Sequence, residues 1–299
     1  MHNRTIATVG ICARNAENTI REAIESVLTQ DFEKDCMELI LVDDGSEDGT
    51  LSIIRFYASK ADIEYRIFGG TRLGLSKARN VVVNNAKGDY IIWVDSDMIL
   101  PTDHVRKQVE FMQNHPKVGL AGARFCGLPE KDLIVELQNL EWKAINHLAE
   151  TNGSLNIPCA VCGGSVYRTE AIRQIGGFDE QIIGAGEDEE LELRLTQAGW
   201  AIQKGTDTYF FERRKKTWKA MWKQFFWYGY GAHLLFHHNK RRVKPSQVLD
   251  PLSLSCVAYR LTGRKIAFML IIQYLFKRIA WCFGFLDAHL HGYGHNPHR

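Results

Sequence analysis

The chain has 299 residues, of which 45% are hydrophobic and 24% are charged, and this ordinary globular composition excludes a disordered or fibrous protein. The net charge of +2 hides a division, because residues 1–211 hold 21 Lys and Arg against 32 Asp and Glu, whereas residues 212–299 hold 16 against 3. An acidic body followed by a basic segment predicts a catalytic or metal-binding part and a tail that faces an anionic partner.

The first hundred residues alternate between apolar runs and amphipathic stretches. Strands are predicted at 6–12, 38–42, 63–68 and 89–94, and helices at 19–30, 50–60 and 75–86. Strands that alternate with helices are typical of βαβ units with right-handed crossovers, so we expect a mainly parallel sheet. The polar loops at the carboxyl ends of these strands are where a ligand should bind.

Beyond residue 101 the pattern is less regular. Helices are predicted at 103–114, 133–149 and 188–198, and strands at 118–125, 160–167 and 201–211. From residue 217 onward Trp, Phe, Tyr, Lys and Arg dominate, with aromatic residues at helical spacing. The expected fold is therefore an α/β domain that carries a basic, aromatic and helical C-terminal extension.

Three acidic motifs stand at the ends of predicted elements: DDGS at 43–46, DSD at 95–97 and EDEE at 187–190. Each has a plain structural interpretation as a helix cap or a turn. Two carboxylates two residues apart at a strand end also suit Mg²⁺ or Mn²⁺, which prefer oxygen ligands. Four successive acids at a helix start exceed what capping needs, so this segment is a candidate for a general base.

These motifs occur in one order with the segments AIESVLTQ, GLSKARN and GGSVYRTEAIRQIGGFDE. Over residues 5–215 the chain thereby resembles glycosyltransferase family 2, and the ordered set is more specific than any single motif. The resemblance implies a GT-A-type, Rossmann-like fold in which helices flank a mainly parallel sheet.

The resemblance also implies a nucleotide site at the strand ends. The residues concerned are Ala13, Arg14, Asn15, Asp43, Asp44, Arg79 and Asp95. Asp44 would bind the base beside the segment 13–15, Arg79 would approach the diphosphate or the base edge, and Asp95 would contact the ribose.

Metal binding and catalysis are implied at the other two motifs. Asp97 would be the direct ligand of Mn²⁺ or Mg²⁺ and Asp95 would share the ion, which would neutralise the leaving diphosphate. Asp188 would take the proton of the acceptor hydroxyl, supported by Glu187. Since no second carboxylate stands out as a nucleophile, single displacement with inversion is implied.

The chain departs from the family pattern in three places. The family usually has Pro-Thr-Tyr-Asn where this sequence has Cys-Ala-Arg-Asn at 12–15, which adds a cation to the rim of the nucleotide site. Many members have a His where this chain has Phe-Phe-Glu at 210–212, so a His-assisted metal site is not expected and Glu212 is a weak substitute. The Q-x-x-R-W motif of processive synthases is missing from the sequence, which favours transfer of a single sugar.

The apolar run at 266–286 is interrupted by Lys277 and Arg278. Two cations in the middle of a span would cost roughly 5 to 7 kcal/mol, so we expect an amphipathic helix at an anionic membrane surface rather than a spanning helix. A helix that packs on the catalytic body or on another subunit is the alternative. If the membrane interpretation holds, the acceptor is expected to be lipid-linked.

Cysteine and histidine residues leave two further patterns. Seven scattered cysteines without framework spacing favour a reducing compartment, and residues 1–15 lack the apolar stretch of a signal peptide. Cys159 and Cys162 lack the further ligands of a zinc site and are expected to pack in a strand. The C-terminal histidines could bind a transition metal, although a solvated terminus is the favoured interpretation for His289, His291, His295 and His298.

The sequence thus predicts an inverting, metal-dependent glycosyltransferase that moves one hexose or N-acetylhexosamine from a nucleoside-diphosphate sugar, with UDP favoured, to a glycan or lipid-linked acceptor. Residues 1–100 would bind the donor, residues 101–215 would carry the acceptor site and the base, and residues 216–299 would form the extension. We expect a cytoplasmic protein, peripheral at the cytoplasmic face of a membrane, without a nucleic-acid partner. The alternatives are a metal-dependent phosphohydrolase and a non-enzymatic nucleotide-sugar binder attached to a membrane.

Overall fold

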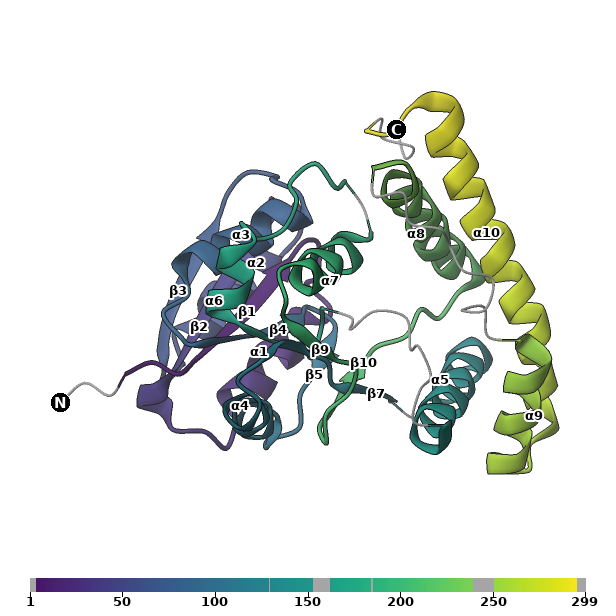
Figure 1. The fold of residues 1–299 in the computed structure, drawn as a ribbon, viewed down its shortest axis with the longest axis horizontal. Coiled ribbons are helices and arrows are strands. Elements are labelled where there is room, and N and C mark those ends of the chain that lie inside the picture. Colours follow the sequence, from purple (N-terminus) through teal and green to yellow (C-terminus); the bar gives the residue numbers. More distant parts are fainter. Residues whose placement is uncertain (1–3, 129, 153–161, 184, 239–249, 295–299) are drawn as a thin grey trace. The chain divides into compact units, whose positions relative to one another are not determined.

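The computed structural model describes residues 4–128, 130–152, 162–183, 185–238 and 250–294. The chain forms two compact units: the first comprises Met1–Phe125, Cys159–Glu180 and Asp188–Glu212, and the second comprises Cys126–Pro158, Gln181–Glu187 and Arg213–Arg299. Figure 1 shows the sheet of the first unit and the long helices of the second. The predicted halves 1–100 and 101–215 both contribute to the first unit, and their separate roles stay predictions.

The first unit is built on a seven-stranded sheet with the order β3-β2-β1-β4-β8-β6-β9. Its first four strands run parallel to one another, as predicted from the alternating pattern. They are β1 (Ala7–Ala13), β2 (Met37–Asp43), β3 (Glu64–Gly69) and β4 (Tyr90–Asp95). The prediction of an α/β fold with a mainly parallel sheet is confirmed.

The helices of the first unit follow the predicted amphipathic segments. Apolar residues three or four positions apart form one face, and in α1 this face buries Ile20, Ile24 and Val27. The other helices that flank the parallel strands are α2 (Thr50–Ala58), α3 (Leu75–Asn85) and α4 (His104–Asn114), and α1 itself spans Ile20–Leu28.

The register of the parallel strands gathers their carboxyl ends at one edge of the sheet. Ala13 of β1 lies opposite Asp43 of β2, and Cys12 of β1 lies opposite Asp95 of β4. The apolar residues before these ends are almost completely buried, so the strands are fixed and their polar ends are placed side by side.

Two of the strands predicted beyond residue 101 are wrong, because each divides into two shorter strands. The segment 118–125 is two strands, β6 (Val118–Ala121) and β7 (Arg124–Gly127), because the chain leaves the large sheet after Gly122 donates to the carbonyl of Gln203. The segment 201–211 likewise divides into β9 (Ala201–Gln203) and β10 (Tyr209–Glu212).

Two short strands also differ from the expectation. Strand β5 (Met98–Ile99) has no counterpart among the predicted strands, and it forms a second sheet with the order β5-β10-β7. Strand β8 (Val166–Arg168) covers only the last two residues of the predicted segment 160–167, whose first two residues lie outside the described residues. Helix α6 (Thr169–Gln174) follows β8 at once. Strand β8 is antiparallel to both β4 and β6.

His104, the first residue of α4, holds this helix to the interior of the first unit. Its Nε2 lies 3.0 Å from the carbonyl oxygen of Gly164, and its Nδ1 lies 3.1 Å from the hydroxyl of Thr208 and 2.9 Å from the carbonyl oxygen of Tyr209. Burial of the ring lowers the pKa of His104 to about 4. A neutral imidazole has one N–H, so it donates to only one of the two carbonyl oxygens, from Nε2 to Gly164 or from Nδ1 to Tyr209.

The buried His104 should make the stability of the protein depend on pH. The unfolded chain takes up a proton on this residue near pH 6.5 and the folded chain only near pH 4, so stability should fall as pH drops between these values, by up to about 3 kcal/mol. Urea unfolding between pH 4 and 7 measures this slope, which should be shallower in His104→Gln whatever the absolute stability of that variant. Equal slopes in the two proteins would contradict the assignment.

The second unit consists of helices, as the predicted extension requires. Helix α9 (Pro251–Thr262) shows why its bounds fall where they do: the side chain of Asp250 caps its first turn, and Gly263 ends it in a left-handed conformation with φ of 69°. A core of apolar residues joins α9 to α5 (Leu133–Asn152) and to the start of α10 (Leu270–His291).

Helices α8 (Trp218–His238) and α10 pack closely along their length (Figure 1). They run in the same direction, since Trp218 near the start of α8 meets Phe276 and His233 near its end meets His289. A side chain at Gly229 would overlap the main chain of α10, and one at Gly284 would overlap the main chain of α8, so two glycines allow the helices to touch.

Among the described residues, the segment Lys265–His291 is long and apolar enough to cross a membrane, and it contains an 18-residue window with a mean hydropathy of 1.5. Lys277, which was expected to oppose insertion, has a side chain that is only 9% exposed and pairs with Glu141. The residues with 41% to 73% exposure form a stripe along this segment, which we call the apolar stripe: Phe268, Ile272, Leu275, Ile279, Phe283, Leu286 and Leu290.

Candidate active site

The ends of β1 and β2 are joined by hydrogen bonds between the loops that follow them. Asp44 donates its N–H to the carbonyl oxygen of Ala13 at 2.9 Å. Asn15, which has a φ of 49°, donates its N–H to the hydroxyl of Ser46 at 3.0 Å and accepts from the N–H of Glu47 at 2.9 Å. The predicted nucleotide segment at 13–15 and the DDGS motif therefore form one surface.

Two buried polar atoms on this surface are available to a ligand. The Oδ1 atom of Asp43 and the Nε atom of Arg14 have no hydrogen-bond partner among the residues that the structure describes. Buried polar atoms are almost always paired, so these two favour a bound group that supplies both a donor and an acceptor. Asp44 is more committed, because its Oδ1 already accepts from the N–H groups of Leu73 and Gly74 at 2.5 and 2.9 Å.

Arg79 lies on α3 and reaches toward the end of β4. Its side chain is 5% exposed, and its guanidinium stands over the rings of Trp93 and Phe178, at 5.8 and 5.5 Å from the ring centroids. Its Nη2 lies 3.4 Å from Oδ1 of Asp95. Packing between two aromatic rings fixes the direction of this cation, so its charge is held beside the DSD motif.

The three carboxylates of the predicted metal and base sites act on one another. Desolvation raises the pKa of Asp95, Arg79 opposes this shift, and the negative charges of Asp97 and Asp188 raise the pKa further. The structure thus brings Asp188 near the DSD motif although 91 positions separate it from Asp97 in the sequence. Three carboxylates beside one guanidinium leave an excess of negative charge, which fits a divalent cation with oxygen ligands.

The four successive acids at the start of helix α7 (Glu187–Gln197) have different surroundings. Glu190 makes two contacts of 2.6 Å with Arg194, whose Nη1 also donates to the carbonyl oxygen of Ile175, so Glu190 serves the packing of the helix. Asp188 accepts the N–H of Glu189 at 2.8 Å, and its charge acts on Asp95, whereas Glu187 is only 5% exposed. Asp188 is therefore the acid of this group whose charge affects the DSD motif.

The position that lacks the family's His is also close to the DSD motif. Strand β10 pairs with β5 so that Glu212 lies opposite Met98, the residue after Asp97. The sequence predicts that Glu212 is only a weak substitute for this His as a metal ligand. The strand pairing places the main chain of Glu212 near the predicted metal site.

Two glycines and an asparagine that do not stand out in the sequence support the site. A side chain on Gly163 would collide with Oδ2 of Asp95 and with the end of Met98, and one on Gly164 would collide with Phe210. Asn80, next to Arg79 on α3, exchanges two hydrogen bonds with the main chain of Phe178 at 2.8 and 2.9 Å. These three residues lie within the quoted segments GGSVYR and KARN, but only the fold shows which residues they contact.

Cysteine chemistry is not a part of this site. Burial raises the pKa of Cys12 to about 12, so its thiol stays protonated beside Asp95. Cys162 is buried against the core of the first unit, and its predicted companion Cys159 lies outside the described residues.

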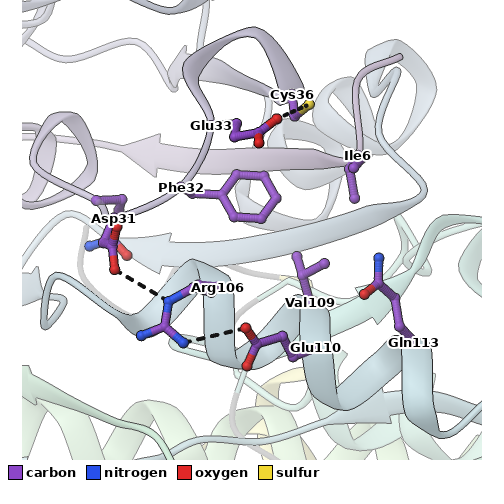
Figure 2. Close-up of a pocket in the computed structure, with 10 residues that line it drawn as sticks. Ile6, Asp31, Phe32, Glu33, Cys36, Arg106, Val109, Glu110 and Gln113 are labelled. Atoms are coloured by element: carbon purple, nitrogen blue, oxygen red, sulfur yellow. Dashed lines mark hydrogen bonds and ion pairs between the residues drawn. The ribbon is translucent and has the colours of Figure 1, made fainter. Parts of the chain in front are cut away.

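The structure also has a pocket of about 620 Å³ at the opposite edge of the sheet, before the starts of β1 and β2 (Figure 2). Three of its four charged residues already bind each other, since Arg106 pairs with Asp31 and Glu110. Figure 2 shows Phe32 near the centre of the lining, with Asp31 to its left and Ile6 to its right. No residue of the predicted donor site lines this pocket, so it is not the site described above.

The strand order and the acidic residues at the strand ends agree with a known protein family. The model of the family described as "Glycosyl transferase family 2" matches residues 8–176, more than half of the chain. The chain belongs to this family. The match includes the strand ends that carry the DDGS and DSD motifs, and it confirms the family expected from the sequence.

Two individual relatives of this family 2 chain are 35% and 26% identical to it over only part of its length. An uncharacterized glycosyltransferase of Haemophilus influenzae is 35% identical over 127 residues, which are 42% of this chain and 50% of that protein. The poly(ribitol-phosphate) β-N-acetylglucosaminyltransferase TarS of Staphylococcus aureus is 26% identical over 187 residues, 60% of this chain and 30% of TarS. The chain thus spans about half or less of the length of these curated relatives.

Solved structures confirm the GT-A-type fold. The mannosyltransferase PcManGT from Pyrobaculum calidifontis, solved with GDP-Man and Mn²⁺, matches 97% of this chain and 87% of its own at a TM-score of 0.63 and 19% identity. S. aureus TarS matches 95% of this chain and 55% of its own at a TM-score of 0.52 and 17% identity. At these identities the likeness concerns the fold of the family 2 chain.

Proposed function

We propose that this chain is an inverting, metal-dependent glycosyltransferase that moves one sugar from a nucleoside-diphosphate sugar to an acceptor hydroxyl. The observation that carries the proposal is the meeting of Asp95, Asp97 and Asp188 beside Arg79 at the carboxyl edge of the sheet. Membership of family 2 supports glycosyl transfer, and relatives named as N-acetylglucosaminyltransferases and a mannosyltransferase neighbour support a hexose or N-acetylhexosamine as the sugar.

The donor would bind along the strand ends, from the loops after β1 and β2 to the DSD motif after β4. The unpaired Oδ1 of Asp43 would accept from the base, and the buried Nε of Arg14 would donate to it, while Arg79 would face the diphosphate. Asp97, with Asp95 shared between metal and ribose, would hold Mn²⁺ or Mg²⁺, which supplies positive charge against the leaving diphosphate.

The acceptor side would depend on Asp188. A carboxylate near the DSD motif and on a separate helix can take the proton of an acceptor hydroxyl as the glycosidic bond forms. Glu190 is bound by Arg194, and with Asp188 as the base no separate nucleophile is assigned, which favours direct displacement with inversion. The segment 176–180, held to α3 through Asn80, would border the acceptor.

The proposal is tested by incubating the protein with UDP, GDP, dTDP and CMP sugars, with and without Mn²⁺, while free nucleotide, phosphate and transferred sugar are measured. We expect UDP sugars to bind with Mn²⁺ and to release UDP in proportion to the sugar transferred to a glycan or lipid-linked acceptor. Release of inorganic phosphate without an acceptor would favour the phosphohydrolase alternative. Tight donor binding with neither product would favour a binding protein.

We further propose that the apolar stripe of 268–290 lies on an anionic membrane surface, where it would meet a lipid-linked acceptor. Exposed apolar patches of this kind are rare on proteins that work in water alone, and the excess of 16 basic over 3 acidic residues in 212–299 complements anionic headgroups. The protein would then lie at the cytoplasmic face of a membrane.

Replacement of Ile272 and Leu275 by Asp should weaken binding to vesicles that contain phosphatidylglycerol, because the two side chains are 62% and 60% exposed and each would lose about 1.5 to 3 kcal/mol of apolar transfer. Cosedimentation measures the change. Phe56→Asp, at a residue 54% exposed on α2, is the matched control and should bind as the parent does. Unchanged binding together with a smaller particle in gel filtration would instead assign the stripe to a contact between subunits.

A further inference from the structure

Three histidines meet at the end of the α8 and α10 pair, within the second unit. His233 and His237 stand one helical turn apart on α8, and His289 comes from the last turns of α10. One nitrogen of each ring lies within 4.8 Å of the corresponding nitrogens of the other two. None of these residues belongs to the donor or acceptor site described above.

The distances between the rings suit a shared ligand better than direct hydrogen bonds. Nε2 of His233 lies 3.4 Å from Nδ1 of His289, which is long for a hydrogen bond between two nitrogens. Two nitrogens that bind one tetrahedral zinc ion at about 2.0 to 2.1 Å are about 3.3 to 3.4 Å apart. The third ring, at up to 4.8 Å, needs only a small side-chain rotation to join them.

The packing of α8 against α10 fixes the main chain that carries the three histidines before any ion binds. The main-chain contacts at Gly229 and Gly284 fix α8 against α10 one to two turns before the histidines. The rings of His237 and His289 are parallel within 10°, and the ring of His233 packs at 5.1 Å from Phe285. A rigid framework lowers the free energy needed to order the ligands.

We propose that His233, His237 and His289 form a binding site for a divalent transition-metal ion, with Zn²⁺ as the ion that fits best. Neutral imidazole is a good ligand of Zn²⁺ and a poor one of Mg²⁺ and Ca²⁺, so this site differs in chemistry from the carboxylates of the donor site. Three protein ligands leave a fourth position for water. The bound ion would link the end of α8 to the end of α10.

The site is tested with full-length protein that carries no histidine tag and has been dialysed against a chelator. Calorimetric titration with Zn²⁺ should show one ion per chain, and Zn²⁺ should raise the melting temperature. His237→Ala and His289→Ala should each weaken binding by at least about tenfold, because even changes outside the ligand shell cost about 10- to 100-fold. Co²⁺ in place of Zn²⁺ should give the visible absorption of a tetrahedral site in the parent and lose it in both variants.

Two further variants distinguish this site from a surface histidine and from the carboxylates of the donor site. His291→Ala removes an exposed histidine on the same helix that pairs with Asp287, and it should bind Zn²⁺ as the parent does. Asp97→Asn alters the proposed donor site and should also leave Zn²⁺ binding unchanged. The proposal is overturned if the parent shows no saturable Zn²⁺ binding, if His289→Ala binds normally, or if Asp97→Asn abolishes the signal.

Discussion

Replacement of Asp97 by Asn should abolish the binding of a nucleotide sugar that depends on Mn²⁺. Asp97 follows β4 in the DSD motif, and the resemblance to family 2 makes it the acid that we expect to bind the ion directly, with Asp95 beside Arg79 sharing it. Loss of a ligand should cost more than a change outside the ligand shell, so we expect donor affinity with Mn²⁺ to fall by at least about 100-fold. Binding without metal should change little, and calorimetry with and without Mn²⁺ measures both values.

Asp103→Asn is the matched control for this experiment. Asp103 lies six positions further on and pairs with Lys107 at 2.7 Å on the surface of α4, so its variant should bind the donor normally. Equal affinity of Asp97→Asn and the parent in the presence of Mn²⁺ would remove Asp97 from the metal site and move the ligand to Asp95 or Glu212.

Replacement of Asp188 by Asn should leave the donor bound but stop the transfer. The amide keeps the size of the side chain and its acceptance of the Glu189 N–H, but it cannot take a proton. General base catalysis contributes about 10²- to 10⁴-fold, so kcat should fall by this factor while the dissociation constant of the donor changes by less than about threefold. Single-turnover transfer and donor titration measure the two quantities separately.

Glu189→Gln, one residue further along α7, controls for the loss of a negative charge near the helix start. It should keep transfer within about twofold, since side chains one position apart do not share a helix face. If Asp188→Asn stays active, Glu187 becomes the first alternative base, and its variant decides the matter. Loss of donor binding in Asp188→Asn would instead assign Asp188 to the metal site.

The sequence predicts the donor half of the fold well and the rest less well. The strands at 6–12, 38–42 and 89–94 come within one residue of β1, β2 and β4, because buried parallel strands are continuous apolar runs between polar loops. The segment 201–211 has the pattern of one strand, since nothing local marks the point at which the chain passes from one sheet to another. Pairing of β10 with β5 depends on residues more than a hundred positions away.

Part of the candidate site can likewise be predicted from the sequence, and part of it cannot. The acids at 43–44, 95–97 and 188 can be named from the sequence because their types and order carry the signal. The pairing of Asn80 with Phe178 cannot, because an asparagine in a helix usually has no such role and its partner is 98 positions away. His233 and His237 do not stand out in the sequence, since the aromatic residues around them have the pattern of a packing face, and the position of His289 near the C-terminus favours a solvated side chain.

The main chain at Gly163 and Gly164 is buried behind Asp95, where a side chain on Gly163 would collide with the Asp95 carboxylate. Main chain in a packed segment has no rotamers to lose, so the backing of Asp95 needs no further ordering when a donor binds. The entropic cost of positioning this carboxylate is therefore met during folding, when the N–H of Gly164 binds the carbonyl oxygen of Trp93 at 2.8 Å.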